Sequence, residues 1–219
     1  MWRTSASVAW RAKVSYIDLM VADGALISLL GFAVVMYITP GPNNVMVAAS
    51  AANHSIRATV PHMFGIVAGF AVMLTLVCAG LGSAIVSWPL LLPAFRWFGA
   101  AWLVVLAWKI ATASPPGEGG RGRVLGFFGA AGFQWINPKG WLIAAAAAGE
   151  YLSPDSQLAI QLARIFVVFL VVGMPCVMVW ALLGSGAGRL LHSPARLRAF
   201  NVSMALLLLL SLIPTLLGD

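Results

Sequence analysis

Six long apolar runs constrain this chain more than any other feature. Each is close to the ~20 residues that an α-helix needs to cross a bilayer, and short connections separate them. The runs are 24–50, 61–86, 90–111, 124–149, 158–183 and 197–217. Runs of this length predict an all-α membrane protein with six transmembrane helices.

Composition and charge agree with a membrane protein. The chain is 61% apolar and only 9% charged, whereas a soluble globular domain has about 25% charged residues. A net charge of +7 raises the question of a nucleic-acid partner. However, the basic residues lie in short loops between apolar runs, where the positive-inside rule places them. We therefore expect a lipid bilayer as partner and no nucleic acid.

The distribution of Lys and Arg predicts an orientation. One side of the predicted spans has more basic residues than the other, and the positive-inside rule makes that side cytoplasmic. Its basic residues are Arg57, Lys109, Arg121, Arg123, Arg189, Arg196 and Arg198. This interpretation places both chain ends outside the cytoplasm.

The chain divides into a short first segment and one membrane domain. Residues 1–19 lack the apolar core and cleavage site of a signal peptide, so they are either a tail or a stretch upstream of a true start at Met20. The membrane domain is 20–219. Within it, a Pro- and Gly-rich joint at 112–123 separates a first half, 24–111, from a second half, 124–217.

The middle of the first apolar run contains a segment that cannot continue a helix. Its prolines donate no backbone hydrogen bond, so the carbonyls of Met36 and Ile38 lose their helical partners. An unsatisfied polar group in hydrocarbon costs several kcal/mol, so such a break survives only inside protein or beside a water-filled cavity. The segment therefore predicts a functional site at mid-membrane depth. It consists of Thr39, Pro40, Gly41, Pro42, Asn43 and Asn44.

A second break repeats the pattern of the first. Thr39-Pro40 in the first run and Asn137-Pro138 in the fourth are 98 residues apart. Thr or Asn at the N-cap followed by Pro at the first helical position is a helix-start signal. Both signals lie halfway along a span, which predicts two helices that stop and restart. Three spans in each half predict two inverted three-helix repeats.

A pair of broken helices suits a zwitterion. The restarted helices present unpaired N–H groups and a positive dipole end to an anion. The stopped halves present the carbonyls of Met36, Ile38 and Gln134 to a cation. An amino acid has both charges, so it is the predicted ligand.

Lys139 directly follows Pro138, near the centre of its span. A charge there costs ~2.5–3.5 kcal/mol on insertion scales, so an ionisable residue at this depth indicates function. The other polar groups at the two breaks repair the broken backbone, contact a substrate, or do both. They are Gln134, Asn137, Asn43 and Asn44.

These motifs resemble the lysine exporter/homoserine-threonine resistance (LysE/RhtB) superfamily. Thr39-Pro40-Gly41-Pro42-Asn43 matches its most specific motif, and Gly65 and Gly69 fit its second-span glycines. The segment 134–139, Gln-Trp-Ile-Asn-Pro-Lys, resembles its fourth-span signature. The chain is most similar to the cysteine/O-acetylserine exporter branch. The resemblance implies a six-span transporter of the bacterial inner membrane that exports amino acids or close derivatives by proton antiport, with no cofactor and no enzymatic activity.

One departure from the family concerns the proton. Some family members have an acidic residue after the second-span glycines, where this chain has Phe70. All six carboxylates lie in tails, loops or span ends. The hypothesis that remains is that His62 or Lys139 carries the proton, since an imidazole changes charge near neutral pH.

A thiol–disulfide electron carrier is the alternative function. Cys78 and Cys176 are also 98 residues apart, so a repeat could bring them to equivalent places. Cysteine in an apolar helix is more often a small hydrophobic residue, and no metal-ligand or catalytic spacing is present.

Two further patterns indicate packing rather than chemistry. Gly65-x-x-x-Gly69 suits close helix packing, within one chain or between two copies, so a homo-oligomer remains open as a partner. Tryptophans near the span ends, Trp88, Trp108 and Trp180, are expected to be interfacial anchors.

Overall fold

The computed structural model describes residues 24–83, 87, 90–113, 125–154, 156–190 and 193–213. Throughout these residues the regular structure is helical and no strand occurs, which confirms the predicted all-α class. Residues 1–19, nearly all of the predicted joint at 112–123 and Trp88 lie outside the described residues.

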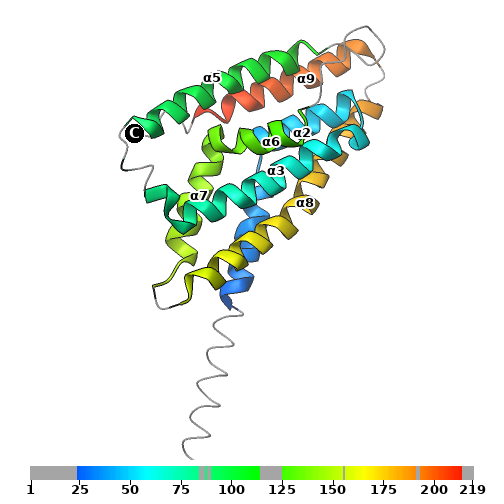
Figure 1. The fold of residues 1–219 in the computed structure, drawn as a ribbon. Helices are drawn as coiled ribbons and strands as arrows, with labels where there is room; N and C mark the ends of the chain where they lie inside the picture. The colour runs from blue at the N-terminus through cyan, green and yellow to red at the C-terminus, as the bar shows by residue number, and fades with distance from the viewer. Residues whose placement is uncertain are drawn as a thin grey trace, which may run out of the picture.

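The helices follow one another with short connections (Figure 1). A first helix, Gly24–Ile38, precedes α2. The remaining elements are α2 (Pro42–Asn53), α3 (Ile56–Leu76), the π-helical turn η1 (Val77–Leu81), α5 (Leu91–Ala111), α6 (Phe127–Phe133), the 3₁₀ turn η2 (Gln134–Ile136), α7 (Pro138–Tyr151), α8 (Leu158–Leu190) and α9 (Pro194–Leu210).

Several helices are long and apolar enough to cross a membrane. Ile56–Leu81 and Leu158–Leu190 meet this condition as single helices. The first helix and α2 meet it together as a pair bent by 55° at the predicted break. A shorter apolar helix spans Trp97–Ala111. Large apolar side chains are exposed on these helices, as expected for surfaces that face lipid.

The ends of two predicted spans differ from the sequence-based expectation. α3 begins at Ile56 rather than at residue 61, because the Ser55 side chain accepts a hydrogen bond from the backbone N–H of Ala58 (3.2 Å) and caps the helix earlier. The end of this span is interrupted at Gly80, whose φ of 115° favours glycine. α8 continues to Leu190, beyond the predicted end at 183.

Glycines bring pairs of helices into close contact. On α3, a Cβ added to Gly65 would lie 2.2 Å from the carbonyl oxygen of Phe127, and one on Gly69 would lie 2.4 Å from Cα of Ala131. The Gly-x-x-x-Gly pattern therefore packs α3 against α6 within this chain. α8 packs in the same way on α2, where a Cβ on Gly184 would lie 2.0 Å from the carbonyl oxygen of Ala48. Both helix pairs can approach this closely only because the glycines have a hydrogen atom where other residues have Cβ.

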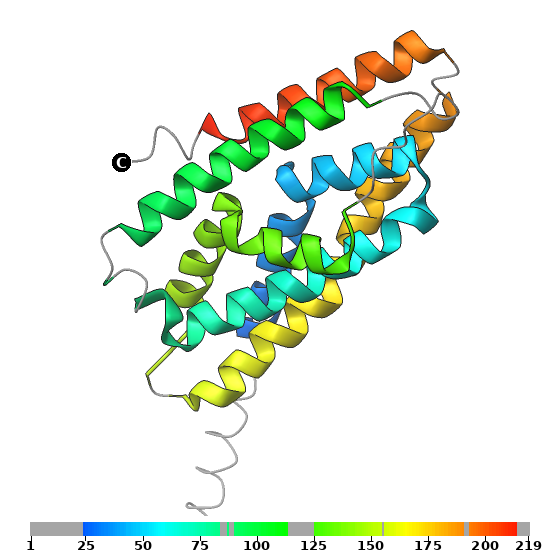
Figure 2. The same cartoon turned by 45° about the horizontal axis from the view of Figure 1, so that its top comes forward.

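Two groups of buried residues hold the helices together. The larger group lies between the first helix, α3 and α8, and includes Tyr37, Phe70 and Phe169, whose rings meet at 5.6–5.7 Å between centroids. The smaller group joins α2 and α6 to the antiparallel pair α5 and α9, which lie side by side in both views (Figures 1 and 2). The broken segments lie between these two groups.

Candidate functional site

The first break separates the helix that ends at Ile38 from α2, which starts at Pro42. The prediction that Thr39 caps the new helix, with Pro40 at its first position, is wrong. Gly41, with an extended φ of 178°, is the N-cap and Pro42 is the first helical residue. The Thr39 hydroxyl instead donates to the carbonyl oxygen of Val35 and ends the helix before the break.

The second break follows the sequence prediction. η2 ends at Ile136, Asn137 adopts an extended conformation with φ −82° and ψ 108°, and Pro138 begins α7. Figure 2 shows α7 turning away from the direction of α6 at this point. Asn137 is the N-cap, but its side chain forms no cap hydrogen bond. Its Oδ1 atom has no partner among the described residues, although Asn137 is only 2% exposed.

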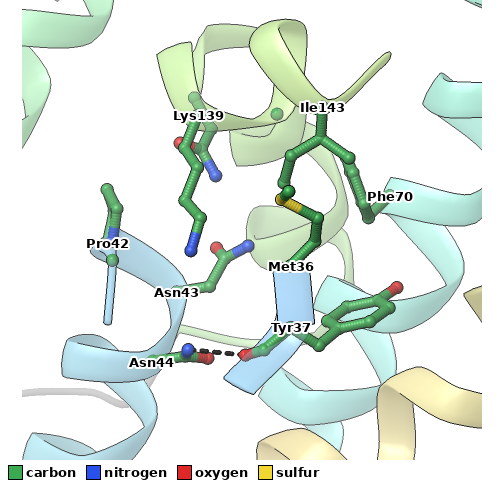
Figure 3. Close-up of a pocket in the computed structure, with 11 residues that line it drawn as sticks. Met36, Tyr37, Pro42, Asn43, Asn44, Phe70, Lys139 and Ile143 are labelled. Atoms are coloured by element: carbon green, nitrogen blue, oxygen red, sulfur yellow. Dashed lines mark hydrogen bonds between the residues drawn. The ribbon is translucent and has the colours of Figure 1, made fainter. Parts of the chain in front are cut away.

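Most of the carbonyls at the first break are bonded by the protein itself. The indole N–H of Trp180, on α8, donates to the carbonyl oxygen of Ile38 (3.1 Å). The Asn44 side-chain amide donates to the carbonyl oxygens of Tyr37 (2.7 Å, dashed in Figure 3) and Thr39 (2.8 Å). The prediction of a free carbonyl is therefore wrong for Ile38. The prediction that Trp180 is only an interfacial anchor is incomplete, because Trp180 repairs the break.

The carbonyl of Gln134 is not free either, contrary to the sequence prediction. It accepts a hydrogen bond from the backbone N–H of Asn137 (3.2 Å), which closes the 3₁₀ turn before α7. Met36, the third residue with a predicted free carbonyl, lines the pocket between the breaks. The 3₁₀ turn thus bonds a carbonyl that Pro138, which has no N–H, would otherwise leave free.

Polar side chains join the two breaks directly. Asn43 and Gln134, 91 residues apart, exchange two amide hydrogen bonds of 2.8 Å and 3.1 Å. The Lys139 ammonium group, at the start of α7, donates to the carbonyl oxygen of Thr39 (2.8 Å) and more weakly to that of Pro40 (3.4 Å). Figure 3 shows the Lys139 side chain reaching from α7 toward Pro42 and Asn43.

Gly41 makes room for the Lys139 side chain. A Cβ added to Gly41 would lie 2.9 Å from Cδ and 3.2 Å from Nζ of Lys139. The N-cap of α2 is therefore also the surface on which the lysine stem lies, and a side chain at this position would make the Lys139 stem shift.

A pocket opens between the two breaks. Six of the ten predicted transport residues line it, namely Gly41, Pro42, Asn43, Asn44, Asn137 and Lys139. Met36, which was predicted only for its carbonyl, also lines the pocket. The other lining residues were not predicted, because apolar residues and glycines carry no distinctive signal in this sequence; they are Tyr37, Phe70, Gly140 and Ile143. The enclosed part is narrow, with room for little more than a water molecule.

The remaining predicted transport residues lie beside the pocket rather than in its lining. Gln134 is buried beneath it through its bonds to Asn43, and Pro138 starts α7. Thr39 and Pro40 contact the site through their main-chain oxygens.

Lys139 has no carboxylate partner in the described part of the chain. Glu150, the one acidic residue there, forms no ion pair with it. The ammonium charge is met only by main-chain carbonyl dipoles, which stabilise a cation without neutralising it.

His62 lies in α3, outside the pocket lining. Its side chain is 1% exposed, and neither ring nitrogen has a hydrogen-bond partner among the described residues. A buried polar group without a partner is costly, so it calls for a functional or structural reason.

The two cysteines are both buried and free, Cys78 in η1 and Cys176 in α8. Within the described residues, no group of three or more His, Cys, Asp or Glu side chains could hold a metal ion.

Comparison with known proteins gives a family match that covers the whole site. The profile of the LysE type translocator family matches residues 34–211. A cysteine/O-acetylserine efflux protein of Salmonella typhimurium strain LT2 is 32% identical over 180 residues, which cover 81% of this chain and 90% of that protein. The protein of the same description in Escherichia coli K12 is 31% identical over 178 residues, with the same coverage. No solved structure matches the chain significantly.

Proposed function

The chain belongs to the LysE type translocator family, a family of transporters rather than enzymes, and from this premise we propose that it exports small neutral amino acids or their derivatives from the bacterial cytoplasm. Cysteine and O-acetylserine are the first candidates, because relatives that align with 81% of this chain are described as cysteine/O-acetylserine efflux proteins. Homoserine and threonine are the second candidates. The location that goes with this function is the inner membrane.

The observation that carries the proposal is the contact between the two breaks. Lys139, at the second break, donates to the carbonyl oxygen of Thr39, at the first, across 100 residues of sequence. A cation at the N-terminal end of α7 is thus bonded to carbonyls that follow the first helix, beside a pocket that Lys139 lines. In the proposed complex, the substrate carboxylate meets Lys139 and the helix starts, and the substrate ammonium group meets the carbonyls of the first break.

Two inverted three-helix repeats are the architecture that we propose for transport. Gly41 and Lys139 are 98 residues apart, as are the Thr39-Pro40 and Asn137-Pro138 motifs, and these two residues are neighbours in space. Equivalent residues of two repeats meet in this way when they lie near the repeat axis. In this proposal α5, the pair α6 and α7, and α9 provide three further crossings, which makes six. One repeat then rocks against the other around the pocket.

Proton coupling is a further part of the proposal. His62 is buried and neither ring nitrogen has a hydrogen-bond partner among the described residues, so its ring is not committed to a structural hydrogen bond. Imidazole changes charge near neutral pH, which makes His62 the first candidate for the proton carrier and Lys139 the second.

The experiment that tests the function is counterflow in proteoliposomes. Purified protein is reconstituted with unlabelled substrate inside, and entry of labelled cysteine, O-acetylserine, threonine and lysine is measured. We expect exchange of at least one of the first three and not of lysine, together with a large loss in Lys139→Met. No exchange of any amino acid by the wild-type protein would contradict the proposal.

The same assay separates this function from thiol–disulfide electron transfer. A double variant, Cys78→Ala with Cys176→Ala, keeps its counterflow if the protein is an amino-acid exporter. Loss of all activity in a folded double variant would favour the electron carrier instead.

A further inference from the structure

The ammonium group of Lys139 occupies the position in which the proposed function places the ammonium group of the substrate. The Nζ atom of Lys139 bonds the carbonyl oxygens of Thr39 and Pro40, which are among the main-chain acceptors at the first break. A substrate amine that approaches these oxygens meets a lysine that already holds them. Two ammonium groups on the same two oxygens would repel each other, so the substrate amine and Lys139 compete for these acceptors.

The contact of Lys139 with these two carbonyls has the features of an interaction that a ligand can replace, rather than those of a permanent structural bond. Lys139 has no carboxylate partner within the described residues, so its charge is only partly compensated. Beside it, the Asn137 Oδ1 atom is buried in the pocket lining and has no partner among those residues. An ammonium group has three N–H donors. Thr39 and Pro40 supply two main-chain oxygens to Lys139, and Asn137, which lines the same pocket as Lys139, has a third oxygen without a partner in the described part of the chain.

We propose that Lys139 is a built-in stand-in for the substrate ammonium, and that a zwitterionic α-amino acid displaces it. The incoming ammonium group takes the carbonyls of Thr39 and Pro40 with Asn137 as third acceptor, and the incoming carboxylate pairs with the released Lys139. This inference rests on the proposed function, and it adds the rule by which the site selects its substrate class.

The rule follows from counting charges. An amine without a carboxylate leaves two cations and no anion in the site, so it is rejected. A carboxylate without an amine pairs with Lys139 but leaves the Pro40 carbonyl without its donor, and leaves the Thr39 carbonyl with the Asn44 amide alone. Only a ligand with both groups leaves every charge and acceptor satisfied.

The stand-in also explains why the pocket is narrow. The Lys139 side chain fills the space above Gly41 and ties α7 to the first break. With substrate bound, this tie is replaced by two contacts to the ligand, and the two broken helices are free to separate. Substrate binding and the release of Lys139 from the first break are then the same event, so only the substrate-bound protein is free to change conformation.

The test uses three compounds that differ in one group each. Cysteine has both charges, cysteamine lacks the carboxylate, and 3-mercaptopropionate lacks the amine. Counterflow of each labelled compound is measured under reducing conditions in proteoliposomes with the full chain. The variants are Lys139→Met, Gly41→Ala and Lys109→Met, the last of which removes the same charge from the last turn of α5.

We expect the wild-type protein and Lys109→Met to exchange cysteine and to reject both analogues. Lys139→Met should lose cysteine exchange and gain cysteamine exchange by about tenfold or more, because the vacated carbonyls then accept a lone amine without repulsion. Gly41→Ala disturbs the lysine stem but keeps its charge, so it should still reject cysteamine. Lys139→Gln replaces the Met variant if that variant is not monodisperse.

The outcomes distinguish the proposed role of Lys139 from the exporter function. A wild-type protein that exchanges cysteine, with a folded Lys139→Met that does not admit cysteamine, overturns the stand-in role and leaves the exporter function intact. Rejection of every amino acid by the wild-type protein overturns the exporter function itself.

Discussion

Asn53, at the end of α2, and Asn201, in α9, exchange two hydrogen bonds between their buried side-chain amides, at 2.8 Å and 3.1 Å. They are 148 residues apart in sequence. The Asn53 amide also donates to the carbonyl oxygen of Ala49, one turn earlier in α2 (2.8 Å). This pair fixes the helix that follows the first break to the α5–α9 pair.

Removing both members of this pair should destabilise the protein by less than the sum of the two single losses. Asn201→Ala leaves the Asn53 amide buried without its partner, at a cost of about 1–3 kcal/mol. The double variant with Asn53→Ala should cost less than the sum of the two single variants. Thermal unfolding in detergent measures both effects, and additive losses would show that the two amides do not depend on each other.

The close approach of α8 to α2 should depend on Gly184. Gly184→Ala places a methyl group 2.0 Å from the carbonyl oxygen of Ala48, which forces the helices apart and should cost about 1–3 kcal/mol. Gly186 is the matched control, because a Cβ there meets nothing within 4 Å. Gly186→Ala should be neutral or slightly stabilising in the same unfolding assay. Equal effects of the two substitutions would argue against the tight contact.

Trp180 should stabilise the first break through its indole N–H. Trp180→Phe keeps most of the ring but removes the donor to the carbonyl oxygen of Ile38, at an expected cost of about 0.5–1.5 kcal/mol and with slower counterflow. Trp108→Phe is the control, since Trp108 is 71% exposed on α5. An unfolding temperature that is equally changed in both variants would assign Trp180 a general packing role only.

His62 should be needed for export that is driven by a pH gradient, and not for counterflow. Counterflow has no net proton requirement, whereas antiport loads a proton on the outer side and releases it in the cytoplasm. His62→Gln should therefore exchange labelled cysteine normally and lose most of its response to an imposed pH gradient. His54→Gln, which changes the histidine at the end of α2, is the control. Gradient-driven export that survives in His62→Gln excludes this residue as the carrier.

The two helix interruptions follow from the sequence because their cause is local. A proline removes its own N–H wherever the chain goes, so the segment 39–44 and Pro138 predict interrupted helices from a few neighbouring residues. The same reasoning placed the first restart two residues too early, at Pro40, because Gly41 rather than Thr39 is the N-cap and Pro42 is the first helical residue.

The sequence by itself determined that the chain is helical and apolar, where its helices break, and which polar residues lie at the breaks. Only the tertiary structure decided how the broken ends are satisfied: Trp180 on Ile38, Gln134 on Asn43, and Lys139 on Thr39. The physical reason is distance along the chain. A missing hydrogen bond is a property of one residue and its neighbours, and Asn44 replaces two of them from nearby in the sequence. Trp180 and Lys139, by contrast, lie 142 and 100 residues from the carbonyls that they bond, and they are brought near only when the helices pack.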